Sequence, residues 1–318
     1  MNGPKEMNLA RASAPTTNFK MSDTKLYRLT GGKAKELQGE SIALEKSLQH
    51  LIEANLDELL GIRFLASEYD TGKAHGGRID SLGLDEDNCP VVLEYKRTSN
   101  ENVINQGLFY LDWLMDHRAD FELLVLKKLG KAASEAIDWE QPRLICIAGD
   151  YIKYDLHAVR QINRNIELMR YKRFGDDLLM LELVNSVTAD QPVAAKAKPA
   201  DPLRGKDRPE EKPEAHLLDL YEELRAYIMA LGDDVTFKQL KHYKSFRRIK
   251  NFACVWTGTK EINIWLKLDP KRETIEKGFT RDVSEIGHWG TGDLEVAFND
   301  REGLEKAKPL ILKAYQKG

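Results

Sequence analysis

Cysteine is scarce in this chain of 318 residues. Cys89, Cys146 and Cys254 occur singly, and no two of them stand at C-x-x-C spacing. Disulfide frameworks and cysteine zinc sites need paired or clustered cysteines. The three residues therefore fit buried thiols in a reducing compartment better than a disulfide framework or a zinc site.

Long hydrophobic runs are also missing. No stretch approaches the roughly 18 apolar residues that a membrane span needs, so we expect no membrane partner. Residues 1–20 lack the apolar core of a secretory signal. We expect residues 1–21 to be a disordered leader, with Met21 as an alternative start, and the protein to be cytoplasmic.

Neither sign of charge dominates. The 48 basic and 51 acidic side chains give a net charge of −3. This net charge does not indicate a nucleic-acid partner, but it does not exclude one, because local basic patches can accompany an acidic active site. Hydrophobic residues make up 42% of the chain and charged residues 31%, as in ordinary globular proteins.

One segment divides the chain. Residues 188–213 are rich in alanine, proline, lysine and aspartate, a composition that cannot bury a core and that proline stiffens. The length of the chain also suggests two domains. We predict an α/β domain over residues 22–187, a linker over 188–213 and a smaller α+β domain over 214–318.

Hydrophobic periodicity and turn residues predict the elements of the first domain. Leucine and isoleucine recur at helical spacing in residues 38–60, with no glycine or proline inside the apolar stripe. We expect further helices at 101–117, 121–129 and 156–165, and strands at 62–68, 143–148, 166–173 and 178–184.

An acidic turn separates two apolar stretches in the middle of this domain. Residues 79–84 precede the turn, residues 85–88 (Asp-Glu-Asp-Asn) form it, and the apolar run 90–93 follows it. Aspartate and asparagine side chains can bond their own backbone in turns. The pattern predicts a β-hairpin.

Three charged side chains lie on this predicted hairpin. Strand alternation puts Glu94 and Lys96 on one face and Tyr95 on the other. If the hairpin folds back in register, Asp80 lies beside Glu94. Two carboxylates at the end of an apolar run are unfavourable unless a cation, a partner charge or water satisfies them. The group therefore predicts a site for a hard divalent cation, Mg²⁺ or Mn²⁺, with a salt-bridged hairpin as the plainer explanation.

The spacing of Asp80, thirteen further residues and then Glu94-Tyr95-Lys96 resembles the PD-(D/E)xK nuclease superfamily. The stretch GRIDSLGLDEDNCPVVLEYKR looks most like its branch of NucS-type endonucleases, with Ile79 in place of the proline of the motif. The resemblance covers about residues 36–186. It implies a restriction-endonuclease-like fold, which is a mixed sheet flanked by helices.

The resemblance also implies roles for residues on the neighbouring helices. Glu45 would join Asp80 and Glu94 as a metal ligand, with Glu53 as the next choice, although a lone helix acid is usually just solvated. Gln106 and Tyr110, one turn apart, resemble a QxxxY signature in which Gln106 supports catalysis and Tyr110 contacts substrate. Tyr110 could equally be a core residue. Catalysis would fall to Asp80, Glu94, Lys96, Glu45 and Gln106, with Arg78 at the substrate.

The second domain carries a basic segment interleaved with aromatic residues. No acid occurs between Thr236 and Lys250, and basic residues mixed with aromatics suit phosphate contact and base stacking. A solvated helix face explains the same segment equally well. Its candidate substrate-binding residues are Lys241, Lys244, Arg247 and Arg248.

A clean alternating strand follows at residues 261–268. Its even-numbered apolar residues face one way, and Trp265 and Lys267 face outward as a candidate contact surface for nucleic acid or protein. The domain resembles an uncharacterised accessory domain found in prokaryotic proteins, a likeness that implies no activity.

These patterns together favour a metal-dependent nuclease, and the expected partner is nucleic acid, DNA rather than RNA. A divalent cation can lower the pKa of bound water and polarise the phosphoryl oxygen, and the resemblance implies that Lys96 would stabilise the developing charge or orient the water. Two alternatives stay open: a catalytically silent nucleic-acid-binding module, and a protein-interaction module that recruits its partner through the second domain. A homodimer would suit double-strand cutting, but the sequence fixes neither oligomeric state nor the number of metals.

Overall fold

The computed structural model describes residues 24–42, 44–97, 103–189 and 213–317. The predicted leader, 1–21, and nearly all of the predicted linker, 188–213, lie outside these residues. No helix in the described ranges is both long and apolar enough to cross a bilayer.

The described residues up to Gly39 form a small compact unit of their own. Its strands β1 (Leu26–Thr30) and β2 (Lys33–Leu37) pair antiparallel around Gly31 and Gly32, which both have positive φ. Almost every side chain in these strands is exposed. The sequence patterns did not predict this hairpin, because it has no buried apolar face.

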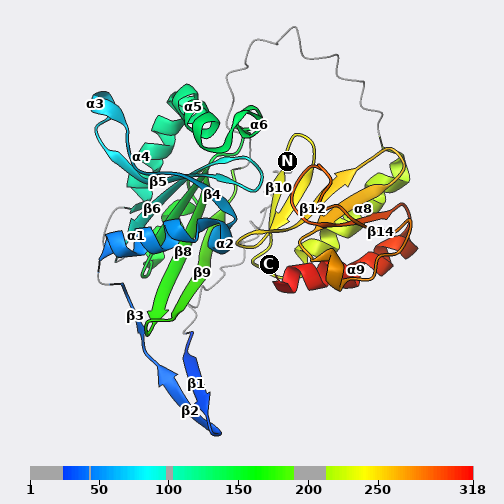
Figure 1. Ribbon diagram of the computed structural model, residues 1–318, viewed down its shortest axis with the longest axis horizontal. Coiled ribbons are helices and arrows are strands. Elements are labelled where there is room, and N and C mark those ends of the chain that lie inside the picture. Colours follow the sequence, from blue (N-terminus) through cyan, green and yellow to red (C-terminus); the bar gives the residue numbers. More distant parts are fainter. Residues whose placement is uncertain (1–23, 43, 98–102, 190–212, 318) are drawn as a thin grey trace, which may run out of the picture. The chain divides into compact units, whose positions relative to one another are not determined.

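A mixed sheet forms the centre of the following α/β domain (Figure 1). In order across the sheet, its strands are β3 (Gly39–Glu40), β8 (Asn165–Phe174), β7 (Arg143–Ala148), β6 (Pro90–Lys96), β5 (Arg78–Asp85) and β4 (Ile62–Asp70), with β9 (Leu178–Val187) beside β8. The strands β4, β5 and β6 pair antiparallel, β6, β7 and β8 pair parallel, and β9 returns antiparallel to β8.

Helices cover both faces of this sheet. On one face, α1 (Glu45–Ala54) and α2 (Leu56–Leu60) bury Leu48, Ile52 and Leu56 against strand residues such as Tyr95. The other face packs mainly against α4 (Val103–Asp116), α5 (Arg118–Leu129), α6 (Lys131–Glu135) and α7 (Lys153–Val159). The predicted α/β class and the hairpin of β5 and β6 are confirmed.

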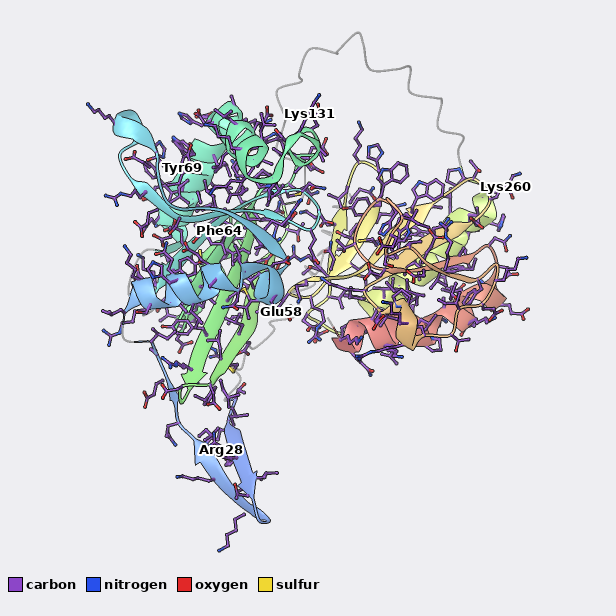
Figure 2. All side chains as sticks on the ribbon, in the orientation of Figure 1. Arg28, Glu58, Phe64, Tyr69, Lys131 and Lys260 are labelled. Atoms are coloured by element: carbon purple, nitrogen blue, oxygen red, sulfur yellow. The ribbon has the colours of Figure 1, made fainter. Side chains whose placement is uncertain are left out.

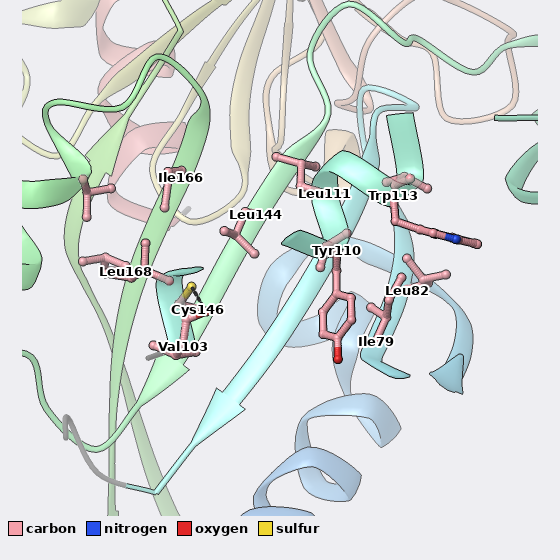
Figure 3. Close-up of a cluster of buried hydrophobic side chains, with 14 of the residues drawn as sticks. Ile79, Leu82, Val103, Tyr110, Leu111, Trp113, Leu144, Cys146, Ile166 and Leu168 are labelled. Carbon is pink, nitrogen blue, oxygen red and sulfur yellow. Dashed lines mark hydrogen bonds between the residues drawn. The ribbon is translucent and has the colours of Figure 1, made fainter. Parts of the chain in front are cut away.

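Figure 3 shows the cluster that α4 forms with the sheet, in which Tyr110 lies beside Ile79 and Leu82. Tyr69 of β4, labelled in Figure 2, packs against the same cluster. Its ring centroid lies 5.5 Å from that of Trp113.

Two predicted helices of this domain were partly wrong. The helix expected at 38–60 begins only at Glu45 and is interrupted at Asn55, a poor helix former, before α2 begins. The helix expected at 156–165 is α7, which ends at Val159, because Asn165 already belongs to strand β8. The glycine-rich loop before the hairpin contains a short helix, α3 (Gly72–His75).

The second domain is an antiparallel sheet with two helices on one face. The strands in spatial order are β10 (Thr236–Gln239), β11 (Lys244–Arg247), β12 (Asn251–Thr257), β13 (Ile262–Leu266), β15 (Leu294–Phe298) and β14 (Thr280–Asp282). Leu217 and Leu224 of α8 (Ala215–Met229) and Leu304 and Ile311 of α9 (Arg301–Lys317) bury that face. A single 3₁₀ turn, η1 (Pro270–Arg272), follows β13.

A buried ionic network lies at the turn of the β5–β6 hairpin. The Asp85 carboxylate is 2.9 Å from the Arg143 guanidinium and 3.5 Å from Lys238 of the second domain. Burial alone would raise the pKa of Asp85, but the charges of Lys238 and Arg143 hold it well below its usual range. Asp87 accepts hydrogen bonds from Tyr243 and Asn251 at 2.9 and 2.8 Å.

Replacing the central acid of this network should destabilise the protein strongly. We expect Asp85→Ala to lower the free energy of unfolding by about 3–5 kcal/mol, because Arg143 and Lys238 would stay buried with one counter-charge fewer, Glu167 and Asp87 being the acids that remain. Asp112→Ala, at an exposed position of α4, should cost roughly 0.5 kcal/mol or less. Urea unfolding of the two variants measures the difference, and equal midpoints would show that the network contributes no net stability.

Candidate active site

The β5–β6 hairpin brings Asp80 and Glu94 together. Ser81 pairs with Leu93 in the ladder, so Asp80 and Glu94 occupy the next opposed positions. The backbone N–H of Asp80 donates to Glu94 Oε1 at 3.2 Å, and that of Tyr95 donates to Asp80 Oδ2 at 2.9 Å. Both carboxyl groups are therefore held against the strand backbone at one end of the hairpin.

Burial dominates the electrostatics of this pair. The Glu94 side chain has no exposed surface, and burial followed by the charge of Asp80 raises the pKa of Glu94 to about 9. Burial also raises the pKa of Asp80 to about 6, although the Tyr95 N–H and Lys96 favour its ionised form. At neutral pH the pair therefore holds one proton.

One oxygen of this pair lacks a partner. Glu94 Oε2 is buried and accepts no hydrogen bond from any residue that the structure describes. Buried polar atoms are normally satisfied, so an orphaned carboxylate oxygen calls for an explanation. The raised pKa of Asp80 points the same way. A cation bound here would offset the cost of burying this unsatisfied oxygen.

Lys96 and Glu45 form an ion pair at the edge of the site. The Lys96 ammonium lies 3.0 Å from Glu45 Oε1, and its side chain is only 12% exposed. Among the described residues, no group of three histidine, cysteine or acidic side chains could hold a metal. In this structure Glu45 contacts the Lys96 ammonium, and its predicted role as a metal ligand stays a prediction.

A second row of polar residues supports the Asp80 strand from α1. Gln49 Nε2 donates to the Asp80 carbonyl at 2.7 Å and to Glu53 Oε1 at 3.0 Å. Glu53 accepts from Ser81 Oγ at 2.6 Å, and the Ser81 and Tyr95 hydroxyls hydrogen bond to each other at 3.2 Å. Glu53, the alternative ligand, is thus occupied in this network.

The supporting role of Gln49 was missed from the sequence, although a signal existed. Glu45, Gln49 and Glu53 recur every four residues and therefore share one face of α1. That face is directed at β5.

Tyr110 proves to be a core residue with a positioning contact. It is buried in the α4 cluster, and its hydroxyl accepts from the Arg78 N–H at 3.2 Å, two residues before Asp80. A Cβ on Gly77 would come within 2.7 Å of this hydroxyl, so glycine is needed there. Gln106 is half-buried one turn earlier on α4, and Arg78 is exposed near Glu68 at 3.7 Å.

Most of the predicted basic patch is used inside the protein. Arg247 is buried, with one nitrogen 2.6 Å from the Ile249 carbonyl. Lys244 lies over the ring of Tyr221 at 4.2 Å, and Arg248 bonds Asp234 at 2.5 Å. The segment folds as strands β10 and β11, so alternate side chains point toward other parts of the protein and contact them. Lys241 is exposed, but Arg247 cannot serve as the expected phosphate contact.

Trp265 was also predicted wrongly as an outward residue. It is 5% exposed, and its indole N–H donates to Glu295 at 3.0 Å. Trp265 does lie on the predicted face of the sheet, opposite the apolar residues of its strand, but neighbouring side chains cover its ring.

Comparisons with known proteins identify relatives without a known role. Residues 209–318 match a family described as a domain of unknown function, DUF5655. An uncharacterized protein from Haemophilus influenzae is 28% identical over 305 residues, which cover 92% of this chain and 99% of the relative. No solved structure matches the chain. The DUF5655 match spans the second domain, which the sequence likened to an uncharacterised accessory domain.

Proposed function

We propose that this protein is a metal-dependent nuclease that hydrolyses phosphodiester bonds, in DNA rather than RNA. The observation that carries the proposal is the buried Asp80–Glu94 pair, with one unsatisfied carboxylate oxygen and the Lys96 ammonium at its edge. A purely structural pair of acids would be expected to be fully paired with donors, because burying an unsatisfied charge is costly.

The residues present fit a hard divalent cation. Asp80 and Glu94 supply carboxylate oxygens, which Mg²⁺ and Mn²⁺ prefer, and two protein carboxylates are the usual complement when water and phosphate fill the remaining positions. A bound cation would supply an activated water and neutralise charge on the phosphate. Glu94 would release its proton to bind it.

The chain's own residues perform the remaining work. Lys96 places a positive charge beside the carboxylate pair, where it can stabilise the negative charge that grows on the phosphoryl oxygens. Glu45 holds that ammonium in position at 3.0 Å. Gln49 and the Tyr95 N–H fix the strand and the carboxylate of Asp80. We assign Asp80 and Glu94 as metal ligands, Lys96 as a catalytic residue and Glu45 and Gln49 as positioning residues.

The architecture supports the proposal. A mixed sheet flanked by helices carries the acids on a central hairpin, as the resemblance to the PD-(D/E)xK superfamily implies. We propose a restriction-endonuclease-like fold for this domain on that basis.

A catalytically silent nucleic-acid-binding module is the second candidate. It is favoured by the pairing of Lys96 with Glu45 and by the lack of a third ligand among the described residues. Such a module would bind strands without cutting them.

Removing the Lys96 ammonium should slow cleavage strongly. With Mg²⁺ or Mn²⁺ and a panel of single-stranded, duplex and branched DNA and RNA, we expect Lys96→Ala to cut at least about 100-fold more slowly than wild type, as for the loss of one charge-stabilising donor. Lys46→Ala, an exposed lysine one residue from Glu45 on α1, should cut normally. Binding of the panel without cleavage by wild type would favour the silent module instead.

The buried pair should also make stability depend on pH in a direction that metal reverses. The folded pKa of Glu94 lies above its unfolded value, so its contribution is present below about pH 4.5 and is lost as the pH rises toward about 9. Without metal, Glu94→Gln should therefore be more stable than wild type at about pH 8 by several kcal/mol, because wild type loses about 1.4 kcal/mol per pH unit between the two pKa values. Mn²⁺ should raise the melting temperature of wild type only. A destabilised Glu94→Gln variant would show that the carboxyl group is structurally required.

A further inference from the structure

The sheet of the second domain has one face that its helices leave open. Side chains alternate along β13, so Ile262 and Ile264 pack with α8 and α9, whereas Asn263 and Trp265 point to the other face. On β12 the register places Cys254 opposite Trp265 and Trp256 opposite Asn263. Away from Ser245 and Lys267, which contact the β5–β6 turn, this face is therefore built of tryptophan and polar residues.

Aromatic rings gather on this face in stacked pairs. Trp265 and His288 lie 5.4 Å apart with nearly parallel rings, at 8°, and His242 and Trp289 lie 5.0 Å apart at 10°. The ring of Trp256 is 6.0 Å from that of Trp289. Trp289 keeps 47% of its surface exposed, so one large ring remains available to a further partner.

These rings border a cavity of about 800 Å³, which lies entirely within the second domain. Its lining includes Trp256, Trp265 and Trp289 together with Asn263, Arg281 and Glu295. Ligand cavities combine apolar and aromatic walls with a few placed polar groups, and this one has both.

The polar side chains that line the cavity hold one another in place through hydrogen bonds. Glu295 is 9% exposed and accepts from Trp265 Nε1 at 3.0 Å and from the Arg281 guanidinium at 2.8 Å. The Arg281 side chain is 60% exposed, so its other donors face solvent. Asn263 is buried and donates toward Glu261 at 3.4 Å. The cavity thus offers acceptors within and a positive charge at its rim.

This combination suits a nucleobase better than other flat or apolar ligands. A planar base can stack on an exposed tryptophan, and its amino and imino groups can donate to carboxylate and amide oxygens. A phosphate attached to it would meet Arg281. A quaternary ammonium, the other usual ligand of aromatic clusters, would meet the Arg281 guanidinium as well as the carboxylates of Glu261 and Glu295, and it has no N–H group to donate to them.

We propose that this cavity binds an unpaired nucleobase through stacking on Trp289 and Trp256. The base can belong to a single strand or to a free nucleotide, and both share the chemistry described. The proposal goes beyond the nuclease activity and does not require it, because none of the cavity residues belongs to the Asp80–Glu94 site. A duplex should bind poorly, since its bases are already stacked and paired.

Binding can be measured in EDTA, where no cleavage occurs. A roughly 12-nucleotide labelled single strand should bind by fluorescence anisotropy and quench tryptophan emission, because three of the five tryptophans line the cavity. Trp289→Ala should weaken binding about 10-fold, within the range for one lost base stack, and Trp289→Phe should retain most of it. Tyr154→Ala, which removes an exposed ring outside the cavity, should bind as wild type.

Two further arms identify the source of the base and separate the alternatives. Quenching by mononucleotides at concentrations that match the oligonucleotide assigns the site to free nucleotides, and quenching by the strand alone assigns it to single strands. Either result supports the cavity. Binding by Trp289→Ala within about twofold of wild type, or equal competition by duplex, overturns the proposal. So does an oligomer that Trp289→Ala dissociates while strand binding is unchanged, which would assign the face to a second copy.

Discussion

Two acidic side chains buried on adjacent strands impose the central constraint on this protein. Asp80 and Glu94 must lie opposite each other for the β5–β6 hairpin to keep its apolar residues in the two cores. Desolvation raises the pKa of both carboxyl groups, and the charge of Asp80 raises that of Glu94 further. A fold that retains this unfavourable pair, with Lys96 beside it, is understandable if a cation joins them during function.

The same hairpin is anchored at its other end. Asp85 and Asp87 in the turn engage Arg143, Lys238 and Asn251, so a single supersecondary unit carries the candidate active site at one end and the contacts to the second domain at the other. Three of the basic residues that the sequence offers to nucleic acid are engaged elsewhere in the second domain: Arg247 is buried, Lys244 packs on Tyr221 and Arg248 bonds Asp234. The tryptophan face of the second domain, in contrast, retains an exposed ring.

Alternation and turn chemistry were sufficient to predict the hairpin and the meeting of Asp80 with Glu94, because strand register leaves few choices. They could not predict that Glu45 pairs with Lys96, since that contact joins residues 51 positions apart through tertiary packing. Composition likewise misled for Arg247 and Trp265. The sequence alone does not show whether a basic or aromatic side chain is exposed to a ligand, because neighbouring elements can bury it.

The central claim is that Asp80 and Glu94 together bind a divalent cation. Isothermal titration calorimetry of Mn²⁺ at about pH 7, repeated in two buffers with different ionisation enthalpies, tests it most directly. We predict binding that releases about one proton, because the raised pKa of Glu94 keeps a proton on the metal-free pair. The absence of binding, or binding with the same heat in both buffers, would contradict the account.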